Sequence, residues 1–522
     1  MTRATLHPRR RALTLALAGS LGGTFVPAFS RHARAADVPR FALGVASGCP
    51  RAQSLVLWTR LTGADLPERV DVHWELAHDE AFTQVAARGR EVADTSGAHS
   101  VHAEPAGLAP GRWYWYRFTA LGQRSAVGRT RTAPAADAPA GPQPLRFAIA
   151  SCQRWDHGHY AAWRHLAHEG QEEGLDLVLF LGDYIYEAGP VAGRVRPHEG
   201  QGPAHSLAQY RARYAQYKSD PALQAAHAAA PWLCVWDDHE VANDYAGLQG
   251  QDLEPGFADR RAHAYQAYWE HMPFPASARP RGPDMRIHER YDWGLLARIH
   301  TVDDRQYRDP QACPKPEHGG GGNTVRLKDC EALRDPRRTL LGEPQERWLA
   351  QGWSGQHGWN LLAQQTLMAR FSWTDPSSAE GAKVWTDGWD GYAPARKRLL
   401  DVIQARRVPG VVVLGGDVHS NYVADLKADF DDARSPVLAT EFCGTSITSQ
   451  GLPQARLDAA LPWNPHIKHG RSDERGYMRF TLDAKRLQAQ LRVLDDVLRE
   501  DSGIRTAARF VVEAGQAGAV AA

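Results

Sequence analysis

The chain contains six short, almost wholly apolar runs, and each of them ends in polar or charged residues. The runs cover residues 145–150, 176–181, 232–236, 295–301, 359–363 and 411–414. Apolar runs of this length are typical of buried strands, and the longer stretches between them suit helices. We therefore predict a layered α/β or α+β catalytic domain, in which closing strands follow from Tyr477 onward. Function is expected beyond the carboxyl ends of the strands, where ligands bind in such sheets.

The first 36 residues have the pattern of an export signal. Three arginines at 9–11 precede an apolar, small-residue run at 12–29, and Ala33-Arg34-Ala35 offers a cleavage site. Paired arginines before a weakly apolar run favour the twin-arginine route, with the twin-arginine translocase as partner. The alternative is an N-terminal anchor helix, for which the run is short. No later stretch is expected to cross a bilayer, so we predict a periplasmic or extracellular mature protein.

A different pattern occupies the region that follows. From Phe41 to about Thr132, short alternating segments are separated by Gly, Pro, Asp and Ser turns, which indicates a small β-sandwich. The aromatic segment 113–118 resembles the late strand of a fibronectin-type domain. An Ala- and Pro-rich stretch at 132–144 breaks both periodicities and is the predicted linker. We expect a signal peptide at 1–36, a β-sandwich domain at 37–134 and a catalytic domain at 145–515.

Six cysteines suit the oxidising compartment that an export signal implies. Cys313 and Cys330 flank a Gly-rich polar loop, and a disulfide closing it would contribute about 3 kcal/mol. Cys234 lies in an apolar run and is expected to be a packed thiol. Cys49 and Cys443 are left unassigned.

The formal net charge of +1 limits the class of ligand. Because acidic and basic residues are interspersed, the charge gives no reason to expect a nucleic-acid or anionic-membrane partner. Any preference for phosphate must come from a local site.

Asp183 follows a glycine at one predicted strand end, and Tyr186 lies three positions later. A carboxylate can bridge two cations, and a phenolate at this spacing can reach the same ferric ion as a hard anionic donor. The alternative is a strand-end turn in which the tyrosine only packs.

A second cluster, Asp237-Asp238-His239-Glu240 with Asn243 close behind, follows the apolar run at 232–236. Burying several ionisable side chains without partners is expensive, so a cation is the economical explanation. Asp238 and Asn243 would supply oxygen ligands, and His239 would be free to protonate a leaving alkoxide. The alternative is a solvated loop that holds a salt bridge.

The third motif, Gly415-Gly416-Asp417-Val418-His419, follows the run at 411–414. In an extended segment, residues two apart share a face, so Asp417 and His419 can converge on neighbouring metals. The two glycines allow close backbone approach.

These three motifs together resemble the calcineurin-type metallophosphoesterases, and the tyrosine narrows the resemblance to the purple acid phosphatases and their relatives. Further motifs resemble the PhoD-like alkaline phosphatase and phosphodiesterase family over nearly the whole mature chain. They lie at 41–48, 57–60, 151–153, 236–240, 305–308, 389–392 and 441–446. The resemblance implies a ferric ion and calcium, and an N-terminal fibronectin- or Ig-like β-sandwich followed by a metallophosphoesterase β-sandwich flanked by helices.

The resemblance also implies a set of metal ligands. Cys152 would be a thiolate ligand and Asp183 would bridge the two metals, while Tyr186 and His419 complete the iron site. Asn243 and Asp417 would hold calcium, with Asp238 as a further ligand. The alternative for Cys152 is a buried, unreactive thiol. The sequence departs from the family pattern at Cys49 and Cys443, which leaves a second disulfide open.

The expected reaction is attack of a metal-activated hydroxide, or of a metal-bridging oxide, at phosphorus. Arg305 is the candidate for stabilising charge on the phosphoryl oxygens, with Arg308 in reserve and a surface ion pair as the alternative for either. His239 would protonate the leaving group. Phosphate mono- and diesters, as small molecules or polymers, are the expected substrates.

Two rival functions are kept. The first is a phosphodiesterase, similar to phospholipase D, that acts on lipids or teichoic-acid-like polymers. The second, from another class, is a secreted binding or adhesion module with a decayed catalytic domain.

Overall fold

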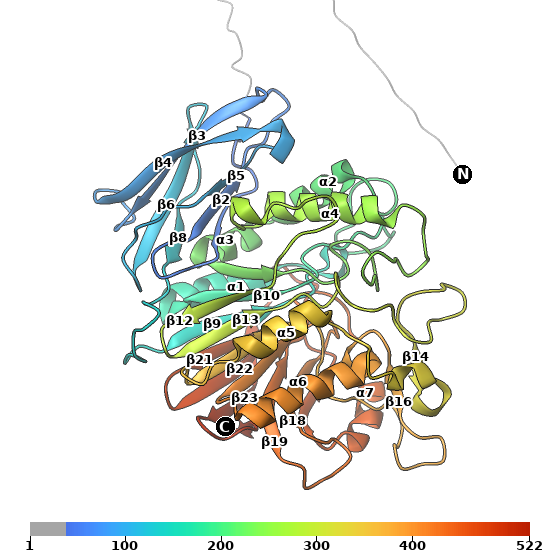
Figure 1. Ribbon diagram of the computed structural model, residues 1–522. Coiled ribbons are helices and arrows are strands. Elements are labelled where there is room, and N and C mark those ends of the chain that lie inside the picture. The colour runs from blue at the N-terminus through green and yellow to red at the C-terminus, as the bar shows by residue number, and fades with distance from the viewer. Residues whose placement is uncertain (1–37) are drawn as a thin grey trace, which may run out of the picture. The chain divides into compact units, whose positions relative to one another are not determined.

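The computed structural model describes residues 38–522, so the predicted signal at 1–36 lies outside the described residues. Two large mixed sheets dominate this part of the chain and helices are few, which defines an α+β fold (Figure 1). None of the helices in the described range is long and apolar enough to cross a membrane.

The larger sheet has ten strands and carries three of the predicted apolar runs. In spatial order the strands are β24 (Val520–Ala521), β23 (Ile504–Glu513), β22 (Arg486–Leu494), β21 (Gly476–Leu482), β9 (Leu145–Ala150), β10 (Leu177–Leu181), β11 (Trp232–Val235), β1 (Val45–Gly48), β2 (Val56–Arg60) and β5 (Ser100–Ala103). Strands β9, β10, β11 and β1 are parallel. The closing strands predicted after Tyr477 are β21 and β22, which pair antiparallel beside β9.

The second sheet has seven strands and carries the other three runs. Its strands, in spatial order, are β12 (Glu289–Trp293), β13 (Ala297–Thr301), β15 (Trp359–Ala363), β17 (Val411–Gly415), β19 (Val437–Cys443), β18 (Asn421–Lys427) and β20 (Ile467–Arg471). Strands β13, β15, β17 and β19 are parallel. Each sheet therefore has a central parallel set whose carboxyl ends are available for ligands.

The two sheets pack against each other, with helices on their outer faces. Phe442 of the second sheet lies 5.3 Å from Phe480 of the first, between ring centroids. Helix α1 (Ala161–Glu169) packs on the first sheet through Trp163, 5.1 Å from Trp232. Helix α6 (Ala393–Arg406) covers the second sheet through Leu400, and α5 (Glu343–Gly352) lies beside it (Figure 1). The other helices are α2 (Leu207–Lys218), α3 (Pro221–Ala229), α4 (Phe257–His271) and α7 (Gln454–Ala460).

The N-terminal strands form a five-stranded sheet that packs on part of the ten-stranded one. It contains β4 (Val85–Asp94), β3 (Arg69–Ala77), β6 (Trp113–Ala120) and β7 (Gln123–Arg124), with β8 (Gly128–Arg131) paired to β6. Val72 and Tyr116 of this sheet share a core with Val45 and Leu57. Gly48 pairs with Trp232, so β1, β2 and β5 continue the larger sheet. Alternation in the sequence predicts half-buried strands, but it does not show which edge each one joins.

A disulfide between Cys313 and Cys330 closes the loop that contains β14 (Thr324–Arg326), which pairs with β16 (Lys383–Trp385) in a small sheet; this disulfide was predicted. Cys234 is a buried free thiol, also as predicted. Cys49 and Cys443 are free as well, so no second disulfide joins them. The Cys443 thiol instead donates to the carbonyl of Gly416 at 3.2 Å.

Candidate metal centre

The predicted ligands arrive from the carboxyl ends of strands in both sheets. Cys152 and Asp183 follow β9 and β10 of the ten-stranded sheet, whereas Asp417 and His419 follow β17 of the seven-stranded sheet. The ends meet closely: a Cβ on Gly416 would lie 2.4 Å from Oγ of Ser151. Only glycine fits at this contact, which explains why the motif begins with glycines.

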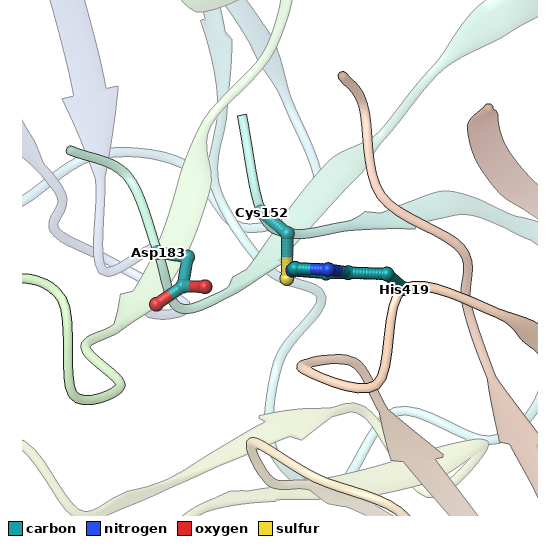
Figure 2. A group of neighbouring side chains, drawn as sticks. All are labelled: Cys152, Asp183 and His419. Carbon is teal, nitrogen blue, oxygen red and sulfur yellow. The ribbon is translucent and has the colours of Figure 1, made fainter. Parts of the chain in front are cut away.

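One group of donor atoms joins Cys152, Asp183 and His419, whose candidate ligand atoms all lie within 4.8 Å of one another. Figure 2 shows the Cys152 sulfur beside the imidazole of His419, with the Asp183 carboxylate next to them. The Tyr186 hydroxyl donates to Oδ2 of Asp183 at 2.6 Å and lies 3.2 Å from Nε2 of His419. The structure therefore brings together all four residues expected around the iron.

A second group joins Asp183, Asp238 and His239, again with candidate atoms within 4.8 Å. Asp183 belongs to both groups, and its Oδ1 is buried without a hydrogen-bond partner in the described chain. Asn243 and Asp417, expected on the calcium side, line the same pocket as Asp238 and His239. A carboxylate shared between two donor groups is the arrangement that a bridging ligand requires.

The backbone at this centre adopts conformations that ordinary residues avoid. Cys152, Asp183, Asp417 and His419 all have positive φ, between 53° and 64°. Each such residue costs about 1–3 kcal/mol, and strain of this kind gathers at functional sites. Nothing in the sequence pattern predicted it, because none of these residues is a glycine.

Mutual repulsion among buried anions characterises the electrostatics. Burial, then repulsion from Asp238 and Asp237, raises the pKa of the Asp183 carboxyl well above its ordinary value, although His239 opposes the shift. Burial, then Asp183 and Asp417, raises the pKa of the Cys152 thiol. A cation would offset this cost and hold both groups as anions.

His239, in contrast, is surrounded by carboxylates that attract its charged form. Its Nδ1 lies 2.8 Å from Oε2 of Glu187, and its ring lies 4.1 Å from that of Tyr186. Burial disfavours the charged imidazole, but Glu187, Asp238 and Asp183 outweigh it and raise the pKa of His239 well above 6.5. These carboxylates favour the charged imidazole, whose ring lines the pocket.

The structure does not place Arg305 where the sequence suggested. Its buried guanidinium binds Asp237 and lies 2.9 Å from Asp387, and it does not line the pocket. Arg308 binds Asp387 at 2.8 Å. The expected contact of either arginine with a phosphoryl group has no support in this geometry, because both are already enclosed in an ionic network. The alternative for either arginine, an ion pair on the surface, is wrong as well, because both arginines are buried.

Sequence reasoning assigned no role to three supporting residues. Glu187 orients His239, and Glu240 accepts hydrogen bonds from the backbone nitrogens of Asp183 and Asp237, the latter at 2.8 Å. Glu187 directly follows Tyr186, and Glu240 directly follows His239. An acidic residue next to a proposed functional residue could have indicated a supporting role. Thr366, which donates to Oδ2 of Asp417 at 2.7 Å, had no signal of this kind.

The family follows from comparison with known proteins. The model of the PhoD-like phosphatase family matches residues 147–491, and that of its N-terminal domain matches residues 27–134. The chain belongs to the PhoD-like phosphatase family, and it is a phosphoesterase, a hydrolase that acts on phosphate esters.

Individual relatives agree with this assignment. The chain is 43% identical to alkaline phosphatase D of Bacillus subtilis (strain 168), over 97% of this chain and 86% of that protein. The solved structure of PhoD superposes with a TM-score of 0.84 at 42% identity, over 92% of each chain.

Proposed function

We propose that the chain is an exported, metal-dependent phosphoesterase of the alkaline phosphatase type that hydrolyses phosphate mono- and diesters. The observation that supports this most is the position of Asp183, which belongs to both groups of donor atoms. Activity then depends on two cations that share this carboxylate.

The donor types indicate which cations the residues suit. Thiolate, phenolate and imidazole from Cys152, Tyr186 and His419 suit a ferric ion. Carboxylate and amide oxygens from Asp238, Asn243 and Asp417 suit calcium. Asp183, with one buried oxygen free of hydrogen bonds, would bridge the two. The two ends of the cluster thus differ in chemistry as an iron–calcium pair requires.

When bound, the two metals would polarise the phosphoryl group and lower the pKa of a water molecule that attacks phosphorus. Asp183, Asp238 and Asp417 fix the geometry of the cluster from three different strand ends. His239 would donate its proton to the departing alkoxide oxygen, and Glu187 holds the ring in place for that transfer. Neither Arg305 nor Arg308 is given the role of stabilising the phosphoryl oxygens, because both bind Asp387 and neither lines the pocket.

Metal removal and restoration test the proposal. Purified enzyme should hydrolyse 4-nitrophenyl phosphate and bis(4-nitrophenyl) phosphate, lose both activities with a chelator, and regain them with ferric iron plus calcium. Retention of full turnover by protein shown to be metal-free would overturn it. Comparing the two substrates also measures the preference for mono- or diesters.

The finer layout follows the same family resemblance. We propose residues 37–134 as the Ig-like domain and 145–515 as the metallophosphoesterase domain, whose β-sandwich would consist of the seven-stranded sheet and the strands of the ten-stranded sheet that lie in this range. Residues 132–144, the predicted linker, contain neither helix nor strand.

Residues 1–36 would direct export by the twin-arginine translocase, which carries folded proteins, so that metals can be inserted beforehand. The disulfide between Cys313 and Cys330 fits an oxidising destination.

The rival functions are separated by the same observations. Membership of a phosphatase family and an assembled donor cluster argue against a binding module with a decayed catalytic domain. A phosphodiesterase acting on lipids or polymers uses the same cluster, so only the shape of the pocket beyond it can discriminate.

A further inference from the structure

The pocket at the donor cluster has a second end of different chemistry. The cavity has a volume of about 380 Å³, within the range that accommodates an organic ligand and not only a phosphate group. Its lining beyond the donors is mostly apolar and aromatic: Leu367, Phe371, Trp373, Trp385, Trp389, Tyr422 and Leu452. We call this the aromatic end of the pocket.

Three rings of the aromatic end contact one another. Phe371 packs edge-on against Trp373 at 4.7 Å and against Tyr422 at 5.8 Å, between ring centroids. Phe371, Tyr422 and Trp389 are buried, whereas Trp373 and Trp385 keep part of their surface exposed. Side chains that are already held in place, with two indoles accessible, can bind an apolar group without a further loss of conformational entropy.

Charges at the aromatic end are also informative. Of the carboxylates that line the pocket outside the proposed ligands, Asp390 pairs with Arg396 at 2.7 Å and accepts the backbone N–H of Phe371 at 2.8 Å, and Asp244 accepts the backbone N–H of Gly322 at 2.8 Å. The guanidinium of Arg456 lies 4.7 Å from the ring centre of Trp373 and is exposed at the rim. Across residues 38–522, no carboxylate forms an ion pair with Arg456. An entering group therefore meets apolar rings and one available cation.

We propose that the aromatic end is the subsite for the organic group of the phosphate ester. It takes ring-bearing or otherwise apolar groups, and Arg456 favours those that carry a negative charge of their own. The inference rests on the proposed function, because it assumes that phosphorus lies at the donor cluster. A small polyol such as glycerol would leave the indoles uncovered and gain little from them.

Two substrates and matched tryptophan variants test the subsite. Trp373→Ala and Trp385→Ala should each raise KM for phenyl phosphate about tenfold, the effect of losing a stacked ring. Their kcat/KM for glycerol phosphate should change less than about twofold. Trp463→Ala, which removes an exposed tryptophan that does not line this pocket, is the control and should alter neither substrate.

Comparing each variant with wild type on each substrate cancels the difference in leaving group. Equal losses on phenyl and glycerol phosphate would show that the indoles serve only the fold, and would overturn the subsite. Wild-type enzyme that hydrolysed neither ester would overturn the proposed function itself, which keeps the two failures distinct.

Binding gives a readout that does not depend on turnover. Phenylphosphonate should inhibit wild type more strongly than inorganic phosphate, and Trp373→Ala should remove that advantage. Arg456→Gln should abolish the preference for 4-carboxyphenyl phosphate over phenyl phosphate; an unchanged preference would overturn the part assigned to Arg456.

Discussion

Nδ1 of His239 lies 2.8 Å from Oε2 of Glu187, and the two side chains form an ion pair at the edge of the donor cluster, in which Glu187 is buried and His239 is partly exposed. Glu187 in turn accepts the backbone N–H of Asn243 at 2.8 Å, so one glutamate supports both the proposed proton donor and a proposed calcium ligand. A lone histidine in this position would be neutral at alkaline pH, because burial lowers its pKa.

Glu187→Gln should move the alkaline limb of the pH–rate profile to lower pH. Glu187 raises the pKa of His239, and a general acid works only while protonated, so losing the negative charge ends activity at a lower pH. We expect a shift of about one pH unit or more. The profile of kcat against pH measures it, and an alkaline limb that stays in place would contradict the pairing.

His239→Ala should reduce kcat by about 10²–10⁴ on an alkyl phosphate, whose leaving group needs a proton. The loss should be much smaller on 4-nitrophenyl phosphate, because nitrophenolate leaves readily without protonation. Steady-state rates on the two esters measure this difference. Equal losses on both, with unchanged metal content, would remove His239 from the proton-transfer role.

Arg305→Met should destabilise the fold by about 3–5 kcal/mol, since it leaves Asp237 as an uncompensated buried charge and leaves Asp387 with Arg308 as its remaining cation. Thermal unfolding measures the loss. Arg326→Met is the matched control: it breaks an exposed ion pair with Glu380 and should cost less than about 1 kcal/mol. A stable Arg305→Met protein with impaired phosphate binding would instead restore the role suggested by the sequence.

Replacing both Cys313 and Cys330 with Ser should destabilise the protein by about 3 kcal/mol, from the entropy of the loop that the disulfide closes. Because Thr324 and Trp385, on the paired strands β14 and β16, line the pocket, KM for aryl esters should rise as well. Denaturant unfolding and KM are the two measurements. Unchanged values of both would separate this disulfide from the pocket.

The candidate site was largely predictable because its ligands follow apolar runs at short, regular spacings. Asp183, Tyr186 and His419 lie together as the spacing and the strand-end rule required. Arg305 also follows a strand, yet its side chain turns into a buried network, and a strand end alone does not determine the direction of a long side chain. The positive φ of Cys152 and Asp183 and the pairing of Gly48 with Trp232 depend on tertiary contacts that local patterns do not encode.

The aromatic end of the pocket was equally hidden from the sequence. Trp373 and Tyr422 belong to segments far apart in the chain, and tryptophans in such segments are ordinarily core residues. Only the fold shows that their rings line the cavity that also holds Asp183 and Asp238.

Metal content and turnover of Asp183→Asn, beside those of wild type, test the shared carboxylate most directly. Wild-type protein should contain iron and calcium and absorb visible light through phenolate or thiolate bound to iron. The variant, with unchanged circular dichroism, should lose both metals and its activity together. A variant that keeps full turnover, or a wild-type enzyme that is active without either metal, would contradict a centre built on Asp183.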